Sequence, residues 1–432
     1  MAPNPAIMQA IEQLGYRITV GDVAAKAGLN LNLAQQGLLA LASDAGGHLQ
    51  VAESGEIAYQ FPQNFRAILR NKFLRLRLLE WWKNIWKVLF YLIRISFAIV
   101  LLVSIALIFL AIAAIVISLN FNRDNDNSGS NDSGGGGIFF FPTFDWFWIF
   151  YPDYDTPQYQ YQRREKSQMN FLLAVFSFLF GDGNPNANLE ERRWQEIGTV
   201  IRNHQGAVVA EQIAPYLDNI GQGYSREYED YMLPVLSRFN GYPQVSPQGQ
   251  IVYYFPDLQV TANQQHPQPV YPYLQELPWG FSAASSGQIM LAIGLGAVNI
   301  IGALMLGNLL AGGTVAAQLG GFVAFVQSIY WLLLGYGTAF LVIPLIRYFW
   351  IQWRNGKISK RNQKREERSI VLNQPSTDLQ AKIAYARQFA TETVINRENL
   401  VYTTETELLE QEITRKDLID EEWQKRLDNS EG

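Results

Sequence analysis

Histidine and cysteine carry much of the acid–base, nucleophilic and metal chemistry of proteins, and this sequence holds few of them. Its three histidines are His48, His204 and His266, and it has no cysteine. The lack of cysteine excludes disulfides, thiolate zinc sites, cysteine-ligated iron–sulfur clusters and cysteine nucleophiles. Walker, Rossmann, HExxH and GxSxG motifs are also missing from the sequence. We therefore predict that the protein is not an enzyme and binds neither a metal ion nor a cofactor.

Two polar turns could bind a cation through carboxylate and amide oxygens. Asp124, Asn125 and Asp126 lie in segment 120–137, and residues 181–186 read GDGNPN. Neither turn has the spacing or the bidentate glutamate of an EF-hand loop. The first segment consists mainly of Asn, Asp, Ser and Gly, so we expect a flexible linker there. Ordinary turn chemistry explains the second.

Three apolar runs must position any site, because the chain is 48% hydrophobic and only 17% charged. Each run lacks charged residues and is long enough to span a bilayer, which takes about 20 residues. The predicted transmembrane helices are segments 95–119, 289–310 and 322–346. In the second helix, Ala303, Gly307 and Ala311 share one face, which would let a neighbouring helix pack closely. A pore lining is the alternative reading of that face.

Basic residues are concentrated in two juxtamembrane segments, 66–94 and 347–368. The side chains that we expect to anchor them at lipid headgroups are Arg66, Arg70, Lys72, Arg75, Arg77, Lys357, Lys360, Arg361, Lys364 and Arg365. The positive-inside rule makes both segments cytoplasmic, whereas three crossings would separate them. We expect the aromatic segment 138–182 to return the chain as an interfacial or re-entrant element, with both termini cytoplasmic. The alternative is a three-span protein whose middle domain lies on the other side.

One pattern occurs twice, in residues 50–62 and 244–256, with seven positions matching at a constant offset of 194. Alternating Ile, Tyr and Phe beside a glycine turn predict a β-hairpin in each copy. Upstream of each hairpin we predict a helix, a short strand and two further helices. Residues 1–65 are called module 1 below, and residues 188–260 are called module 2.

Local signals make the elements of the modules more specific. Thr19 is expected to cap the second helix of module 1 together with Asp22, and Asn30 precedes the third helix. The core candidates of that third helix are Leu31, Leu38, Leu39 and Leu41. In module 2 we expect Pro234 to kink a third helix over 228–239.

This order of elements resembles the winged-helix variant of the helix-turn-helix fold, and residues 19–25 (TVGDVAA) resemble the opening of its second helix. DNA-binding members need Lys and Arg on the third helix and the hairpin. Residues 31–42 contain neither, and residues 1–65 hold two basic against five acidic residues. Residues 190–260 hold five against nine. Because this balance repels DNA, we expect no nucleic-acid partner and interpret both modules as acidic protein-docking domains.

The order of segments along the whole chain also carries a resemblance. Together with FSFLFGDGNP at 176–185 and EQIAPYL at 211–217, it resembles an uncharacterized membrane-protein family of cyanobacteria and chloroplasts. That resemblance implies a thylakoid or plasma-membrane location and supplies no catalytic residues. Some plant members carry an iron–sulfur-cluster-biosynthesis label, which the absence of cysteine argues against here.

The remaining segments are a Pro- and Tyr-rich linker, 261–288, and an acidic tail, 369–432, with predicted helices at 379–393 and 404–427. The tail has an apolar stripe that we expect to dock on the modules or on a partner: Leu408, Leu409, Ile413 and Leu418. The predicted fold is an α-helical integral membrane protein carrying two winged-helix-like α+β domains and a helical acidic C-terminal tail.

The function that fits these features is a scaffold or assembly factor in a photosynthetic membrane. Its expected partners are the lipid bilayer and a membrane protein or complex, with a homo-oligomer as a further option. A membrane-tethered transcription regulator is one alternative, and a channel or transporter subunit is another.

Overall fold

The computed structural model describes residues 4–72, 74–124, 170–264, 266–311, 318–396 and 400–407, with positions 410, 411, 413, 416, 420 and 423. The chain divides into two compact units. Unit 1 comprises Met1–Trp82, Asn186–Leu277 and Lys357–Gly432, and unit 2 comprises Lys83–Pro185 and Pro278–Gly356. The two modules and the tail, which the sequence suggests as separate domains, therefore belong to one unit.

Module 1 has the order of helix, strand, helix, helix and hairpin that the sequence predicts. Its elements are α1 (Pro5–Gln13), β1 (Arg17–Thr19), α2 (Val20–Ala27), α3 (Leu31–Ala45), β2 (His48–Ala52) and β3 (Ile57–Gln60). The side chains of Asn4, Thr19 and Asn30 cap these helices by accepting hydrogen bonds from N–H groups of the first turn. The capping box of Thr19 with Asp22 is confirmed.

One core prediction in module 1 is wrong. Leu31, Leu38 and Leu41 are buried, whereas Leu39 is 54% exposed. Because a helix turns by about 100° per residue, the residue after Leu38 points away from the direction that Leu38 and Leu41 share. The apolar type of Leu39 was therefore a poorer guide than its place in the helical period.

Module 2 repeats the order with shorter second and third helices. Its elements are α8 (Leu189–Asn203), β4 (Ala207–Val208), α9 (Ala210–Ile213), η1 (Ala214–Tyr216), α10 (Tyr224–Glu227), η2 (Asp230–Met232), α11 (Leu233–Phe239), β5 (Tyr242–Val245), β6 (Ile251–Tyr254), α12 (Pro256–Gln259) and β7 (Val260–Thr261). The predicted kink at Pro234 in a helix over 228–239 is wrong. Pro234 lies in the first turn of α11, where its missing N–H has no intrahelical partner.

The two hairpins share one register. The pair Leu49–Tyr59 of module 1 and the pair Pro243–Tyr253 of module 2 are related by the offset of 194. The sheets differ at their outer edge: module 1 has the order β1-β3-β2-β9, whereas module 2 has β4-β6-β5. The additional strand of module 1 comes from the C-terminal tail.

The tail contains strands that the sequence analysis does not predict. The predicted helix 379–393 is replaced by α17 (Thr377–Ala386), η3 (Arg387–Phe389) and β8 (Thr393–Val394), which pairs in parallel with β7. β9 (Leu400–Thr403) pairs antiparallel with β2. Alternating Leu, Val, Tyr and Thr suit a strand once an edge is available. The prediction of a wholly helical tail is therefore wrong for these residues.

Two further predictions concern the linker and the apolar stripe. Leu274 is fully buried and Glu276 is 5% exposed, so segment 261–288 is fixed to unit 1 at these positions. Of the stripe, Ile413 is 62% exposed. Leu408, Leu409 and Leu418 lie outside the described residues.

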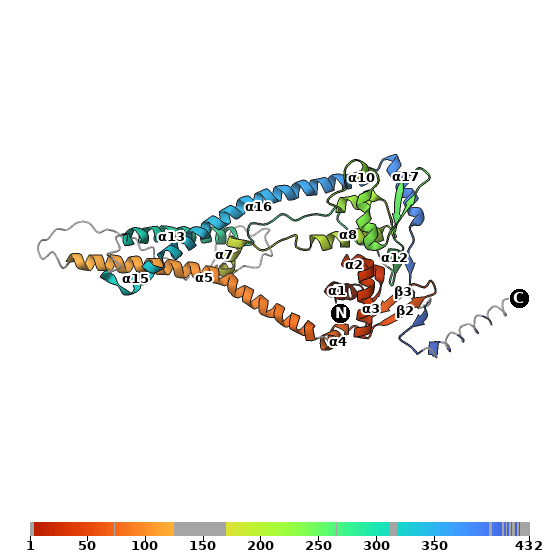
Figure 1. Ribbon diagram of the computed structural model, residues 1–432, viewed down its shortest axis with the longest axis horizontal. Helices are drawn as coiled ribbons and strands as arrows, with labels where there is room; N and C mark the ends of the chain where they lie inside the picture. The colour runs from red at the N-terminus through yellow and green to blue at the C-terminus, as the bar shows by residue number, and fades with distance from the viewer. Residues whose placement is uncertain are drawn as a thin grey trace, which may run out of the picture. The chain divides into compact units, whose positions relative to one another are not determined.

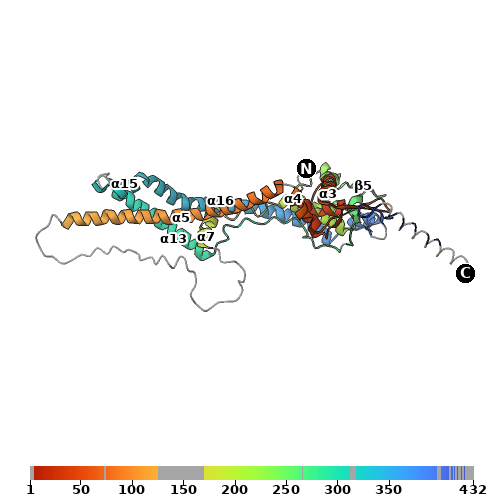
Figure 2. The ribbon, with the colours of Figure 1, turned by 90° about the horizontal axis from the view of Figure 1, so that it is seen from below.

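In its described residues unit 2 is helical, and three of the helices found there are long and apolar enough to cross a membrane. Its helices are α5 (Leu74–Asp124), α7 (Phe171–Phe180), α13 (Ser286–Leu310), α15 (Gly321–Ser328) and α16 (Tyr330–Asn373), of which α5 and α16 continue into unit 1. Figures 1 and 2 show α5 and α13 side by side. The predicted third span, 322–346, is interrupted at Ile329, where α15 ends. The predicted linker 120–137 begins inside α5, and its residues after Asp124 lie outside the described residues.

Contacts within unit 2 define the directions of the three long helices. Asn299 on α13 donates to the Ser104 hydroxyl on α5 at 2.7 Å, and Gly302 packs against Ile108, so α5 and α13 run parallel. On α16, Tyr336 donates to the carbonyl of Phe97 at 2.6 Å, whereas Leu333 belongs to the cluster of Ile108. α16 therefore runs antiparallel to both.

The two basic segments meet at one end of this bundle. Arg94 lies 5.3 Å from the ring centroid of Phe176, and Arg347 donates to the carbonyl of Ser177 at 3.2 Å. Phe176 and Ser177 are neighbours on α7, so the start of the α5 span and the end of the α16 span lie together. The part of the predicted re-entrant segment at 138–169 lies outside the described residues.

The small residues of α13 have different surroundings. Ala303 is fully buried, and a Cβ at Gly307 would collide with the Tyr330 hydroxyl. Ala311 is exposed at the end of the helix. A second close contact involves Asn299, which is fully buried, because a Cβ at Gly337 would collide with its side-chain oxygen.

We predict that Gly337→Ala destabilises the helix bundle. The added methyl group has no room beside Asn299, and overpacking of this kind costs about 1–3 kcal/mol. The variant should have a lower midpoint of thermal unfolding in detergent, followed by circular dichroism. Gly335→Ala is the matched control, because no atom lies within 4 Å of its added Cβ. Equal midpoints for the two variants would contradict the packing described here.

Candidate functional site

Modules 1 and 2 meet along α2 and α8, and two glycines make the contact close. A Cβ at Gly21 would collide with the backbone oxygen of Asp257, and a Cβ at Gly198 would lie 2.8 Å from the Cα of Ala25. Buried residues of both modules form one hydrophobic cluster across this contact. The modules are therefore joined backbone to backbone, with no room for a side chain at either point.

A buried carboxylate lies at the centre of this junction. Asp22 is 2% exposed and accepts a hydrogen bond from the N–H of Thr19 at 2.8 Å as part of the α2 cap. The same carboxylate accepts from the N–H of Ala262 at 3.1 Å and from the Thr261 hydroxyl at 3.2 Å. It also pairs with Arg202 on α8 at 2.5 Å. One side chain thus caps a helix, fixes the end of β7 and binds module 2.

A buried arginine extends this junction to the tail. Arg17, 9% exposed, donates to the Gln50 side chain at 2.9 Å within module 1. It also donates to the carbonyl of Ala262 at 2.5 Å and to the carbonyl of Ile395 at 2.7 Å. Because charged hydrogen bonds of this kind are strong and directional, Arg17 connects β1, β2, the segment after β7 and the tail.

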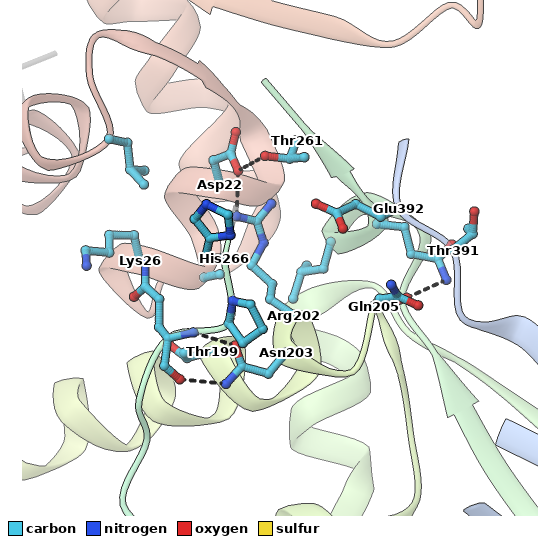
Figure 3. A pocket seen from close by; sticks show the side chains of 16 residues that line it. Asp22, Lys26, Thr199, Arg202, Asn203, Gln205, Thr261, His266, Thr391 and Glu392 are labelled. Atoms are coloured by element: carbon cyan, nitrogen blue, oxygen red, sulfur yellow. Dashed lines mark hydrogen bonds and ion pairs between the residues drawn. The ribbon is translucent and has the colours of Figure 1, made fainter. Parts of the chain in front are cut away.

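A cavity of about 170 Å³ lies beside the ion pair (Figure 3). The charged side chains in its lining are Asp22, Lys26, Arg202 and Glu392, and His266 is the titratable neighbour. With two cations and two carboxylates, the lining favours neither an anion nor a cation. Across the cavity, Asn203 donates to the carbonyl of Gln268 at 2.8 Å.

The three histidines do not form a metal centre in the part of the chain that the structure describes. No group of three or more His, Asp or Glu side chains there is placed to hold a metal ion. His48 Nδ1 lies 3.2 Å from the carbonyl of Thr404, and His204 Nδ1 lies 2.8 Å from that of Val200. The contacts of Asp22 join α2, the segment after β7 and α8.

A second buried ion cluster fixes the tail on module 2. Lys382 on α17 is 6% exposed and lies 2.9 Å from the Glu211 carboxylate and 2.6 Å from that of Glu229. Tyr253 on β6 donates to Glu229 at 2.9 Å. Burial raises the pKa of Glu229, against the opposing effect of Lys382, and burial followed by the Glu229 charge raises the pKa of Tyr253. A buried lysine needs such partners, so α17 has a defined seat on module 2.

Two predicted lipid anchors form ion pairs in unit 1. Arg365 is only 2% exposed and pairs with Asp218 and, at 2.8 Å, with Glu276. Arg361 donates to Glu276 at 2.7 Å. Burial alone would raise the pKa values of Asp218 and Glu276, but hydrogen bonds and charges from these arginines and from Arg193 outweigh it and lower both. The anchoring prediction is therefore wrong for Arg365, because its guanidinium is buried in unit 1.

The other predicted anchors are nearer the surface. Arg66 pairs with Glu12, and Lys72 lies 2.7 Å from the Asp44 carboxylate. Arg66, Lys72 and Arg361 are exposed residues, as are Arg70, Lys357, Lys360 and Lys364. The side chains of Arg75 and Arg77 lie outside the described residues. For the exposed members, contact with lipid headgroups stays a prediction.

Sequence reasoning identified Asp22 only as a helix cap, and it missed Arg17, Arg202 and Lys382. Arg17 did carry a signal, because it stands between Tyr16 and Ile18 in a predicted core strand, where a charge needs a partner. Arg202 and Lys382 stand on helices with other charges, and nothing in their spacing distinguishes them from solvated residues.

The chain is similar over nearly its whole length to an uncharacterized chloroplastic protein of Arabidopsis thaliana. The two are 37% identical over 432 aligned positions, which cover 97% of this chain and 81% of the plant protein. No family model matches the chain, and no solved structure matches it. The relative supports the chloroplast part of the resemblance noted above, whereas the cyanobacterial part stays a prediction.

We predict that Arg202→Met opens the contact between the modules. Removing one partner of a buried ion pair leaves Asp22 uncompensated, at a cost of about 3–5 kcal/mol. Amide hydrogens of α2 and α8 should then exchange faster with deuterium in the full-length protein. Arg226→Met is the matched control, because Arg226 is an exposed arginine of the same module. Unchanged protection in the Arg202 variant would show that the ion pair does not hold this junction.

Proposed function

The chain belongs to the family of this uncharacterized chloroplastic plant protein, and from that membership we propose that it is a non-enzymatic scaffold or assembly factor of a photosynthetic membrane. Three helices of membrane-spanning length support an integral anchor, and the chloroplastic relative supports the location. In this proposal modules 1 and 2 are winged helices of the acidic, protein-binding kind. Their partner is a membrane protein or complex.

The direction of the helices supports a single side for all of unit 1. Arg94 and Arg347 lie at the same end of the bundle, beside α7. The positive-inside rule makes that end cytoplasmic, or stromal in a plastid. The chain passes from unit 2 to unit 1 next to residues 83, 185, 278 and 356. The segments that carry module 1, module 2 and the tail are therefore connected in sequence to this end of the bundle. The proposal therefore favours an even number of crossings over the three-span alternative.

The observation that carries the docking proposal is the inward orientation of module 2's positive charge. Of its five arginines, only Arg226 is an exposed residue. Arg193 pairs with Glu190 and Asp218, and Arg202 pairs with Asp22. Arg238 donates to the carbonyl of Gly28 at 3.0 Å. Five acidic residues of the module are exposed beside this one arginine, so its exposed residues keep a net negative charge, which favours a basic protein segment over a nucleic acid.

An exposed aromatic pair gives this acidic surface a point of attachment. Tyr224 and Tyr228 on module 2 stack with ring centroids 4.4 Å apart and are 74% and 53% exposed. Glu227 and Asp230 are exposed beside them. Tyrosine faces attract arginine and lysine, and neighbouring carboxylates add to that attraction. The partner chemistry that fits is a basic segment of a membrane protein.

We predict that both hairpins lie on one side of the membrane. Ser54→Cys and Gln248→Cys place single thiols at the equivalent, exposed hairpin turns of a chain without cysteine. Gln318→Cys places one after α13, at the other end of the bundle. We use sealed vesicles whose cytoplasmic (or stromal) face is outside. An impermeant thiol reagent should label positions 54 and 248 together, and position 318 only after the vesicles are opened. Labelling of 54 and 248 from opposite sides would refute the topology.

We predict that Tyr224→Ser combined with Tyr228→Ser weakens binding of the membrane partner. Crosslinking in photosynthetic membranes, followed by capture of the full-length protein in mild detergent, should recover one subunit with the wild type. Its yield should fall about tenfold in the double variant, as for the loss of about 1.4 kcal/mol. The control is Tyr271→Ser, because Tyr271 is 67% exposed outside module 2. Equal yields from all three proteins would remove the aromatic pair from the proposal.

A further inference from the structure

The outer edge of the module 1 hairpin is a site that binds an extended strand. Within the hairpin the N–H of Ala52 donates to the carbonyl of Glu56, so the alternate residues Leu49 and Val51 direct their backbone groups away from β3. β9 pairs with this edge, and Val51 lies opposite Tyr402. The site is thus a row of outward backbone groups of β2, and β9 supplies their hydrogen-bond partners.

Contacts just beyond β9 fix its position on the edge. The N–H of Thr404 donates to the carbonyl of Leu49 at 3.0 Å. The N–H of Leu49 in turn donates to the Thr404 hydroxyl at 2.9 Å. His48 Nδ1 lies 3.2 Å from the Thr404 carbonyl. A threonine immediately after the strand therefore completes the recognition.

Module 2 has the same hairpin with this edge closed. Pro243 stands at the position equivalent to Leu49, and it has no N–H to offer an incoming strand. The next outward carbonyl, that of Val245, accepts a hydrogen bond from Tyr385 at 3.3 Å. One edge of the pair thus carries a device against strand pairing, whereas the other has the donor and acceptor that pairing needs.

The rest of the tail is held without β9. Lys382 fixes α17 on module 2, β8 pairs with β7, and Ile395 is 1% exposed with its N–H bonded to Thr261. β9 itself is held by backbone bonds and by Leu400, which packs against a small buried cluster with Ile395, and its Tyr402 is 37% exposed. Detaching β9 would therefore remove the Leu400 contact and leave the hydrogen bonds and the ion pair of Asp22 in place.

We propose that β9 exchanges between copies of this chain, so that Leu400–Thr403 of one copy pairs with β2 of a second copy. The occupant is a second copy because the segment seated on this edge is the chain's own, with a register that any copy can reproduce. Anchoring of both copies in one membrane raises their effective concentration and favours the exchange. This homotypic contact goes beyond the docking function proposed above and does not rest on it.

The test uses two full-length chains that carry one thiol each, in a protein that otherwise lacks cysteine. Val51→Cys and Tyr402→Cys place the thiols opposite each other in the β2–β9 ladder. When differently tagged chains are produced together in one membrane and oxidised, we expect a disulfide-linked heterodimer on a non-reducing gel. If the thiols link only in a chain that carries both substitutions, while the mixture stays monomeric, the proposal is overturned. A disulfide to a different protein would overturn the assignment to a second copy.

A second pair of variants separates strand exchange from chance contact. Leu49→Pro copies into module 1 the residue that module 2 tolerates at the same place, so the hairpin should still form. Leu49→Pro removes the hydrogen bond that the Leu49 N–H donates to the Thr404 hydroxyl, and β9 must detach from its own copy before it can exchange. When separately prepared, differently tagged chains are brought into one membrane, the heterodimer should therefore form up to about tenfold faster, and its final yield should be unchanged because the same contact is weakened within and between copies. Pro243→Leu is the control and should leave the rate unchanged. A rate that is insensitive to Leu49→Pro would overturn the proposal.

Discussion

The buried ion pair of Asp22 with Arg202 is the contact on which the arrangement of unit 1 depends. A carboxylate with 2% exposure is costly unless every oxygen has a partner. Asp22 finds its partners in the cap of its own helix, in the strand that follows module 2, and in α8. Because the same side chain must satisfy all three, the modules have one relative position in unit 1. The close glycines Gly21 and Gly198 are then a requirement, since no other residue fits.

This use of charge also explains the character of the surface. Four cations of unit 1 each join two segments that are distant in sequence. They are Arg17, Arg365 and Lys382, which are at most 9% exposed, and Arg202, whose side chain is 12% exposed. Cations that join segments inside are no longer available outside. Module 2 is left with one exposed arginine beside five exposed acidic residues, so it does not present the basic surface that DNA binding needs.

Much of the local structure follows from the sequence, because its causes are local. The capping box at Thr19, the hairpins and the three long apolar helices depend on neighbouring residues and on periodicity. Predictions failed where distant residues decide the outcome. Leu39 is exposed because α3 buries its other face, Arg365 is buried because Asp218 and Glu276 receive it, and β9 is a strand because β2 offers an edge. The candidate site consists almost wholly of such contacts, so only its capping carboxylate was identified beforehand.

The two hairpins show how one pattern can be recognised in two ways. On module 2 the tail is bound through side chains. The ring centroids of Phe389 and Tyr254 lie 5.7 Å apart, and Lys382 pairs with the carboxylates of Glu211 and Glu229. On module 1 the tail is read mainly through backbone groups, which any extended segment with suitable side chains can supply. A contact of the first kind is specific to its own tail, whereas a contact of the second kind is open to exchange. The two edges differ at Pro243 in one copy and Leu49 in the other, the position just before the matched pattern, so divergence beside the pattern gives the two edges different contacts.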